Sequence, residues 1–520
     1  MQQTREFMAK KDYRNASITV RQIRRLNPDN LEALRVNAEL AELSGAPQAI
    51  DARRRIAELA PTVENKVTLA STAMRFQGKP YPLATQVLEE LRQAGTTDAV
   101  YHAVSAELAL RLNRKEAAMT EYESASRAEP TNQLHTLNLA VLRLRATNGT
   151  EAAEARATLE KLGVSPTVGV HALRWLTSDA LERNELGQAK QYSSELLKGS
   201  NRIDDRLQHL AILDKAADAE EGAFLSGLQQ TAATNAFEVY RLCQWMAGHG
   251  RADEGIGWFS NCPAKVRTEQ PAPLGKVDCL VAKKDWSQLE KFLQSEKWGD
   301  REFLRLAYLS RTAEEQKETI GVQARWRAAL RAAEDRIGPL SMLLDLATAW
   351  RRPDGREEVL WVIAERCPRE KWALRELQRI YEAQLNTRGL NKVCTSLANR
   401  DPKDMQAAND LAATSMLLKV NLPEAYQLAR ETYTNHPNEA FIVSTYAYSL
   451  HLQGRSKEGL TAMEKLKPEA LEQPPVALYY GLLLNFSGET NRAGKYLALA
   501  GKANLLPEEK ILLAAAAGKP

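Results

Sequence analysis

The sequence predicts an all-α protein, a right-handed α-solenoid of about 13–15 stacked antiparallel helix hairpins. The first observation is a recurring step of twelve residues from a small or apolar side chain to a loop residue. It runs from Ala16 to Pro28, Ala49 to Pro61, Ala84 to Thr96, Ala118 to Pro130, Ala189 to Asn201, Leu390 to Pro402 and Ala425 to Pro437. The second observation is that the loop residues at 28, 61, 96 and 130 lie 33, 35 and 34 apart. A period near 34 residues is typical of one helical hairpin copied many times.

Each copy shows the pattern of two helices joined by a polar turn. In residues 99–112 apolar side chains recur at every third or fourth position, which predicts a first helix. A polar turn at 113–116 follows, and the second helix is expected to end before Pro130, because proline cannot continue a helix. Residues that tolerate the left-handed backbone conformation are expected to divide the hairpins at Gly45, Asn113, Asn184, Gly250, Gly454 and Gly488.

Small residues hold fixed places in this pattern, as expected where two helices cross closely. In one hairpin the small residues are Ala118 and Ala125, with the aromatic Tyr122 between them and Pro130 after them. Later hairpins combine an aromatic residue with small ones in the same way, at Tyr446, Ala447 and Gly459 and at Tyr480, Gly481 and Ala493. This arrangement resembles the tetratricopeptide repeat (TPR) family. The resemblance implies a superhelix whose first helices line a concave groove that holds an extended peptide or a partner helix.

The strength of the repeat pattern predicts four segments. Residues 1–200 form an N-terminal TPR array, 201–400 a divergent helical-repeat segment, 401–505 a C-terminal TPR array, and 506–520 a closing helix and tail. In the divergent segment Gly255, Phe259 and Cys262 still fit the expected positions of a second helix.

The charge of the chain is almost balanced, with 70 Lys and Arg against 66 Asp and Glu. A net charge of +4 over 520 residues gives no support for bulk electrostatic binding to nucleic acid, so no nucleic-acid partner is expected. No run of 18 apolar residues occurs, so no membrane span is expected in this chain.

The sequence contains no motif of the GxSxG, GxxxxGK[ST], HExxH or GxGxxG types. The protein is therefore not expected to be an enzyme, and no cofactor is expected. Cys243, His249 and Cys262 could approach one another in one hairpin and bind zinc. The two cysteines also occupy places that need a small side chain, so we expect buried thiols and no metal site.

Eight of the nine tryptophans fall between Trp245 and Trp372. Most of them, including Trp258, Trp286 and Trp326 on second helices, are expected to fill the core of the divergent segment. Trp372 differs because it opens a first helix that also carries Arg375 and Arg379 on the same face.

Aligning the repeats on their Ala and Pro positions identifies first-helix residues that are expected to face the groove. The candidate partner-binding set, rich in arginine and aromatic residues, is Arg301, Tyr308, Arg311, Trp372, Arg375, Arg379, Tyr448 and His451. Arginine makes bidentate contacts with carboxylates, so this surface suits an acidic or carboxylate-bearing segment. The alternative is that these residues are ordinary solvated helix charges.

The function these features favour is a non-catalytic interaction scaffold that binds a protein or peptide in the solenoid groove. Many bacterial proteins of the TPR family serve cell-envelope, secretion or polysaccharide assembly, and the resemblance implies such a setting. Two alternatives stay open. One is an RNA-binding helical-repeat protein, which would need a basic groove, and the other is a peptide-sensing regulator that lacks its output domain.

The first repeat is phased so that its first helix should begin before Met1. We therefore expect the natural chain to start further upstream, where an anchor or export signal could lie. The five cysteines form no CxxC pair and are expected to be reduced, which fits a cytoplasm slightly better than an oxidising compartment. The compartment thus stays open between the cytoplasm and, with such a signal, a periplasmic or membrane-associated location.

Overall fold

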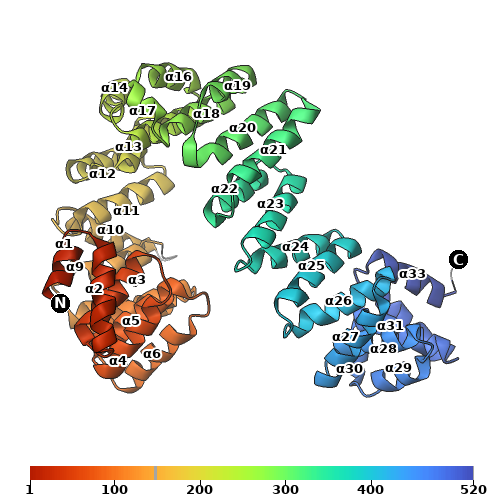
Figure 1. Cartoon of the computed structure of the whole chain (residues 1–520). Coiled ribbons are helices and arrows are strands. Elements are labelled where there is room, and N and C mark those ends of the chain that lie inside the picture. The colour runs from red at the N-terminus through yellow and green to blue at the C-terminus, as the bar shows by residue number, and fades with distance from the viewer. Residues whose placement is uncertain (146–148, 519–520) are drawn as a thin grey trace. The chain divides into compact units, whose positions relative to one another are not determined.

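The computed structural model describes residues 1–145 and 149–518, and this part of the chain consists of helices and loops without any strand (Figure 1). It contains 33 α-helices and one short 3₁₀ helix, η1. Apart from the short helices α17 and α30 and the closing helix α33, the α-helices follow one another in pairs, as in the predicted hairpins. The expected all-α solenoid is confirmed. The chain separates into two compact units, Met1–Lys283 and Lys284–Pro520.

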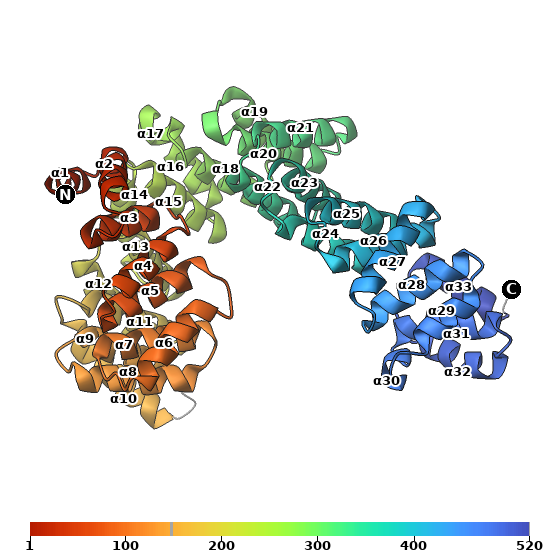
Figure 2. The same ribbon diagram turned by 60° about the horizontal axis from the view of Figure 1, so that its bottom comes forward.

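Unit 1 (Met1–Lys283) is a succession of helices that lie side by side (Figure 2). Its helices are α1 (Gln2–Ala9), α2 (Tyr13–Leu26), α3 (Leu31–Leu43), α4 (Ala49–Leu59), α5 (Val63–Phe76), α6 (Pro82–Gln93), α7 (Ala99–Arg111), α8 (Lys115–Ala128), α9 (Gln133–Arg143), α10 (Gly149–Gly163), α11 (Gly169–Glu182), α12 (Leu186–Gly199), α13 (Ile203–Lys215), α14 (Glu221–Ala232), α15 (Ala236–Gly248), α16 (Ala252–Asn261), α17 (Ala264–Thr268) and α18 (Ala272–Lys283).

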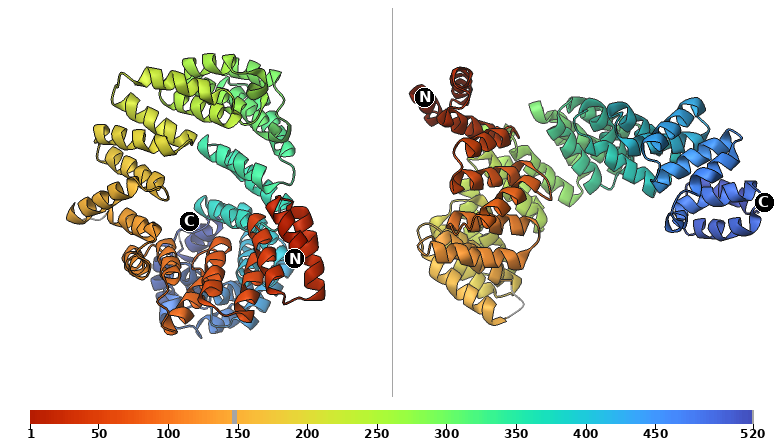
Figure 3. Two further views of the ribbon diagram at one scale, coloured as in Figure 1. Left: turned by 90° about the vertical axis from the view of Figure 1, so that its left-hand side faces the viewer. Right: turned by 90° about the horizontal axis from the view of Figure 1, so that it is seen from below.

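Unit 2 (Lys284–Pro520) continues in the same manner, and its helices remain side by side in further views (Figure 3). Its helices are α19 (Trp286–Ser295), η1 (Gly299–Arg301), α20 (Glu302–Glu315), α21 (Thr319–Ala332), α22 (Ile337–Ala349), α23 (Pro353–Arg366), α24 (Trp372–Ala383), α25 (Thr387–Arg400), α26 (Met405–Leu418), α27 (Leu422–Asn435), α28 (Ala440–Leu452), α29 (Ser456–Met463), α30 (Pro468–Leu471), α31 (Pro474–Phe486), α32 (Thr490–Ala500) and α33 (Pro507–Ala516). The subdivision expected at residues 200, 400 and 505 rests on the repeat pattern and stays a prediction.

The predicted turn residues end first helices in the left-handed conformation. Their φ angles run from 59° to 85° at Gly45, Asn113, Asn184, Gly250, Gly454 and Gly488. After α7, the Asn113 amide donates to Leu110 and the Arg114 amide donates to Ala109, at 2.9 and 2.8 Å. These bonds satisfy carbonyls that the end of a helix leaves without an intrahelical partner.

The small residues lie where the two helices of a hairpin touch. Ala118 and Ala125 of α8 are fully buried, as are Ala16, Ala84 and Ala189 at the equivalent positions. Between α28 and α29 the approach is closest at Gly459, where an added Cβ would lie 2.7 Å from the carbonyl oxygen of Ala447. A side chain at this point would push the two helices apart.

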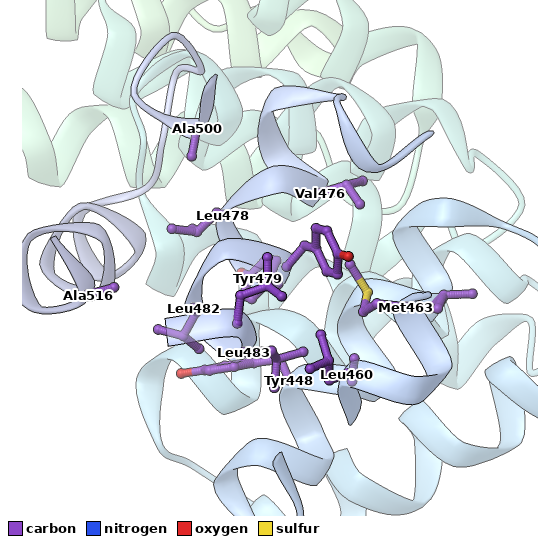
Figure 4. Packing of buried hydrophobic residues seen from close by; sticks show 14 of the residues in the cluster. Tyr448, Leu460, Met463, Val476, Leu478, Tyr479, Leu482, Leu483, Ala500 and Ala516 are labelled. Atoms are coloured by element: carbon purple, nitrogen blue, oxygen red, sulfur yellow. The ribbon is translucent and has the colours of Figure 1, made fainter. Parts of the chain in front are cut away.

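A large core cluster lies at the C-terminal end of unit 2 (Figure 4). It joins α26 to α33 and contains Tyr448, Tyr479 and Tyr480 with many leucines and alanines. The closing helix expected after residue 505 is α33, and its Ala516 belongs to this cluster. Among the described residues, no helix combines the length and apolarity that crossing a membrane requires.

Two glycines of α16 allow a matched test of hairpin packing. At Gly255 an added Cβ would lie 2.7 Å from the sulfur of the buried Cys279, whereas at Gly257 it would meet no atom within 4 Å. Gly255→Ala is expected to destabilise the chain by about 1–3 kcal/mol through overpacking. Gly257→Ala should stabilise it by about 0.5–1 kcal/mol, because alanine favours the helix.

The two variants should be compared with the wild type by urea unfolding followed by circular dichroism. Equal unfolding midpoints for both substitutions would show that the contact between α16 and α18 tolerates a larger side chain.

Candidate partner-binding surface

The first helix α24 carries three of the candidate residues, of which two are exposed and one is half-buried. The Trp372 side chain is 41% exposed, and its Nε1 donates to Glu370 Oε2 at 2.8 Å. Arg379 lies seven residues later, which brings it to the same face two turns along the helix. Its side chain is 76% exposed and pairs with Glu376 at 3.0 Å, an arrangement that costs little to exchange for another carboxylate.

Arg375, the third candidate on α24, has a half-buried side chain that is bound to the neighbouring hairpin. Its guanidinium donates to Asp404 and, at 3.0 Å, to Gln378. Asp404 in turn caps α26, because its carboxylate accepts from the Ala407 amide at 3.0 Å. Arg375 therefore links one first helix to the start of the next, and it is less available to a partner than Arg379.

Tyr308 and Arg311 meet around a tryptophan that the sequence did not single out. The Tyr308 ring lies edge-on to Trp350 at 5.4 Å, and the Arg311 guanidinium lies 6.0 Å from the centre of the same ring. Arg311 also pairs with Glu314 at 3.1 Å and with Glu315. The two contacts with the Trp350 ring join the end of α20 to the end of α22, so this pair of candidates serves hairpin packing.

The same region explains a second tryptophan. Trp326 on α21 is fully buried, which confirms the prediction that it fills the core. The Arg352 guanidinium lies 4.7 Å from its ring, and burial lowers the pKa of Arg352. Arg301 is the last residue of η1 and precedes α20, at the opposite end of that helix from Arg311.

The predicted exposure of Tyr448 is wrong. Its side chain is only 4% exposed and lies in the C-terminal core cluster, 5.1 Å from the Tyr479 ring (Figure 4). Burial raises the pKa of Tyr448 to about 12. The physical reason is that α31 covers this face of α28. The repeat pattern of a single hairpin shows which face of a helix a residue occupies, but it does not show which helix covers that face.

His451 lies at the edge of the same cluster. Its ring meets Phe486 edge-on at 4.5 Å, and its Nδ1 lies 3.0 Å from Ser456 Oγ. Burial lowers the pKa of His451, so the ring is neutral near pH 7. Phe486, which the sequence analysis missed, is 65% exposed and presents the apolar surface at this place.

Seven of the eight candidates thus form three separate groups on α20, α24 and α28, and Arg301 lies apart from them in η1. Beside the α24 group lies a cavity of about 300 Å³ where α24, α25 and α26 meet α31 and α33. Its polar walls are Gln378, Glu382, Gln406, Asp410 and Glu509. Gln378 connects this cavity to the candidate surface, because it accepts from Arg375 and donates to Glu382 at 3.0 Å. No catalytic or binding motif marks these residues in the sequence.

Several groups around this cavity have perturbed pKa values. Burial raises the pKa of Asp410 to about 6 and the pKa of the Cys394 thiol to about 12. Burial and the neighbouring Glu509 carboxylate hold the pKa of Tyr479 well above its usual value. The tyrosine therefore stays protonated, and its hydroxyl donates to Glu509 Oε1 at 2.8 Å.

Unit 1 has a hollow of its own, with a volume of about 510 Å³, where the first helices α11, α13 and α15 meet. Arg174 of α11 lines it and donates two hydrogen bonds to Asp205, at 2.8 and 2.7 Å. Arg241 donates to Asp204 at 2.7 Å from α15. Each arginine is therefore neutralised by a carboxylate of the neighbouring first helix.

Cys243 and Cys262 of the divergent segment are buried as expected. Cys243 and Cys262 lie in one core cluster, and Cys279 Sγ contacts the Cys243 carbonyl oxygen at 3.3 Å. His249 turns away to stack on Trp245, with 4.1 Å between ring centres. No group of three or more potential metal ligands occurs in residues 1–145 or 149–518.

No protein-family model matches the chain, and no curated protein matches it. Among solved structures, it is similar to the Cut9–Hcn1 hetero-tetramer of APC/C, with 11% identity, a TM-score of 0.32, and coverage of 86% of this chain and 95% of that one. PilW, a widely conserved type IV pilus biogenesis factor, matches with 19% identity, a TM-score of 0.28, and coverage of 44% and 90%. Naa15/Naa10 bound to HypK-THB matches with 13% identity, a TM-score of 0.26, and coverage of 99% and 77%. At these scores the fold assignment rests on the helix pairing described above.

The pKa of Asp410 leads to a pH-dependent stability. Because the folded-state pKa of about 6 exceeds the usual 3.8, the folded chain is stabilised at low pH, and this contribution is lost as the pH rises through 6. Asp410→Asn removes the titration. The wild type should therefore lose about 1 kcal/mol more than the variant between pH 5 and pH 8.

Urea unfolding at both pH values measures this difference. Asp345→Asn removes an exposed carboxylate from the first helix α22 and should keep the pH dependence of the wild type. An Asp410→Asn profile that follows the wild type would contradict the desolvation of this carboxyl.

Proposed function

We propose that the protein is a non-catalytic scaffold that binds a protein or peptide segment on the first helices of unit 2. The observation that carries this proposal is the exposure of Trp372 and Arg379 on one face of α24. An exposed tryptophan beside an exposed arginine has the composition of an interface hot spot. Two half-buried carboxylates nearby, Glu370 just before α24 and Glu376 on it, accept hydrogen bonds from the same two side chains.

The use of side chains inside the hairpins supports a binding role over catalysis. Arg311, through the Trp350 ring, and Arg375, through Asp404, join neighbouring hairpins, and Cys394 is a buried thiol with a pKa of about 12. A nucleophilic cysteine needs a lowered pKa and access to a substrate. The cavity beside α24 has the polar walls of a recognition site, and its carboxyl and amide groups bond mainly to one another.

The chemistry of the surface favours a segment with an apolar anchor and a carboxylate. The anchor would pack on the Trp372 ring, and the carboxylate would replace Glu376 at Arg379, where a bidentate contact adds specificity. The nearly balanced charge and the internal pairing of the first-helix arginines speak against an RNA backbone as ligand. A role in bacterial envelope, secretion or polysaccharide assembly remains the setting that the family resemblance suggests.

The double variant Trp372→Ala with Arg379→Glu tests the surface. It should lose at least about tenfold of the partner captured by the wild type, because removal of a hot-spot tryptophan commonly costs about 2 kcal/mol or more. The measurement is affinity capture from the native lysate, followed by quantitative mass spectrometry, with equal helicity checked by circular dichroism.

The matched control is Ile320→Ala with Arg331→Glu, which alters an exposed apolar residue and an exposed arginine on the second helix α21. This control should capture the partner as the wild type does. Loss of capture in the control, or retention in the α24 variant, would remove the first-helix surface from the proposal.

A further inference from the structure

The closing helix α33 is attached to a part of unit 2 that is distant in the sequence. The Thr387 hydroxyl at the start of α25 donates to Glu508, which follows 121 positions later. One residue on, Glu509 accepts from the Tyr479 hydroxyl of α31 at 2.8 Å. At the other end of the helix, Asn485 Nδ2 donates to the Ala516 carbonyl oxygen at 3.0 Å.

These contacts show how α33 is oriented. Near the start of α33, Glu509 contacts Tyr479 of α31. Near the end of α33, Ala516 contacts Asn485, which lies further along α31. The two helices therefore run in the same direction. A parallel neighbour of α31 occupies the place that the first helix of another hairpin would take. The seat of α33, which we define as Thr387, Tyr479 and Asn485 with the cavity walls around them, is therefore shaped for a helix.

This helix is held less tightly than the hairpins beneath it. The cavity of about 300 Å³ that Leu506 and Glu509 help to line lies on one side, and a larger hollow of about 660 Å³ separates α33 from part of α32. Ile511 is 69% exposed, while Leu512 and Leu513 are only partly buried. Voids and exposed apolar groups mean few stabilising contacts, so α33 can detach without disturbing the stacked hairpins.

We propose that the seat of α33 is a second docking surface, which takes a helical segment of another protein with the chemistry that α33 displays. This segment carries carboxylates in its first turn and leucine and alanine on one face. α33 occupies the seat in the free protein and competes with the partner. The inference extends the scaffold function proposed above to a site that does not include Trp372 or Arg379.

The residues of the seat explain why the docked segment should carry carboxylates. Two hydroxyl donors, Thr387 and Tyr479, point to neighbouring residues of one helix turn. Each is buried, so a segment without an acceptor there would leave a donor unsatisfied, which disfavours apolar or basic side chains at these two positions. The partly buried leucines add the apolar contact that a helix in a groove requires.

Because α33 competes for the seat, it determines how high the affinity of a partner must be. The linker between α32 and α33 comprises residues 501–506, and a short linker gives an effective concentration in the millimolar range. A free segment identical to α33 should therefore bind the wild type poorly and bind well once α33 is released.

The test uses the full chain with Glu508→Ala and Glu509→Ala, together with a fluorescein-labelled peptide of residues 504–518. Hydrogen exchange of residues 507–516 should become faster in this variant, and the peptide should bind it at least about tenfold tighter than it binds the wild type. A peptide that carries the same two substitutions should not bind. Adding Tyr479→Phe or Thr387→Val to the released chain should weaken peptide binding, while adding Trp372→Ala with Arg379→Glu should leave it unchanged.

Three results would overturn the proposal. Unchanged exchange in the variant would mean that the carboxylates do not hold α33, and released α33 without peptide binding would mean that no separate docking surface exists. A wild-type dimer with exchanged α33 helices, detected by light scattering, would assign the seat to a second copy of the chain. Each result is independent of capture by Trp372 and Arg379, so this inference and the proposed function can fail separately.

Discussion

The close crossing of the two helices in each hairpin is the constraint on which the rest of the structure depends. Where α28 meets α29, the Ala447 carbonyl leaves no room for a Cβ at position 459, and the alanines at equivalent places in other hairpins are fully buried. Since each hairpin is too small to bury its apolar faces alone, it is stable only when neighbours cover them. The interior of the array is thus committed to packing, and any binding function has to use what remains outside.

Charged residues follow the same division. Arg174 with Asp205 in unit 1 and Arg375 with Asp404 in unit 2 each join one first helix to the next. Partly buried pairs of this kind fix the alignment of neighbouring hairpins, because removing one partner would leave an uncompensated charge. Arg379 belongs to the other class, since its ion-pair partner Glu376 lies on its own helix and its guanidinium remains accessible to solvent. Burial and pairing, more than residue type, therefore separate the arginines that hold the array together from those that can meet a partner.

The sequence was sufficient to predict those parts of the fold that depend on contacts within one hairpin. The period, the buried alanines and the left-handed turns at Gly and Asn follow from steric limits within one hairpin. The left-handed residues Lys317, Leu385 and Lys419 carry no such signal, since neither lysine nor leucine favours that conformation. The exposure of Trp372 could be predicted from its position on α24, whereas the burial of Tyr448 could not. That burial depends on α31, and the attachment of α33 depends on a contact between residues 121 positions apart.

Packing and binding are most closely related at α33. An element with few buried contacts unfolds locally more easily than a hairpin that is stabilised by neighbours on both sides. α33 is flanked by two cavities, yet its glutamates satisfy buried hydroxyl donors that would otherwise lack an acceptor. Its attachment is therefore specific in chemistry and modest in strength. A surface with these two properties can exchange one helix for another while the hairpins below it keep their structure.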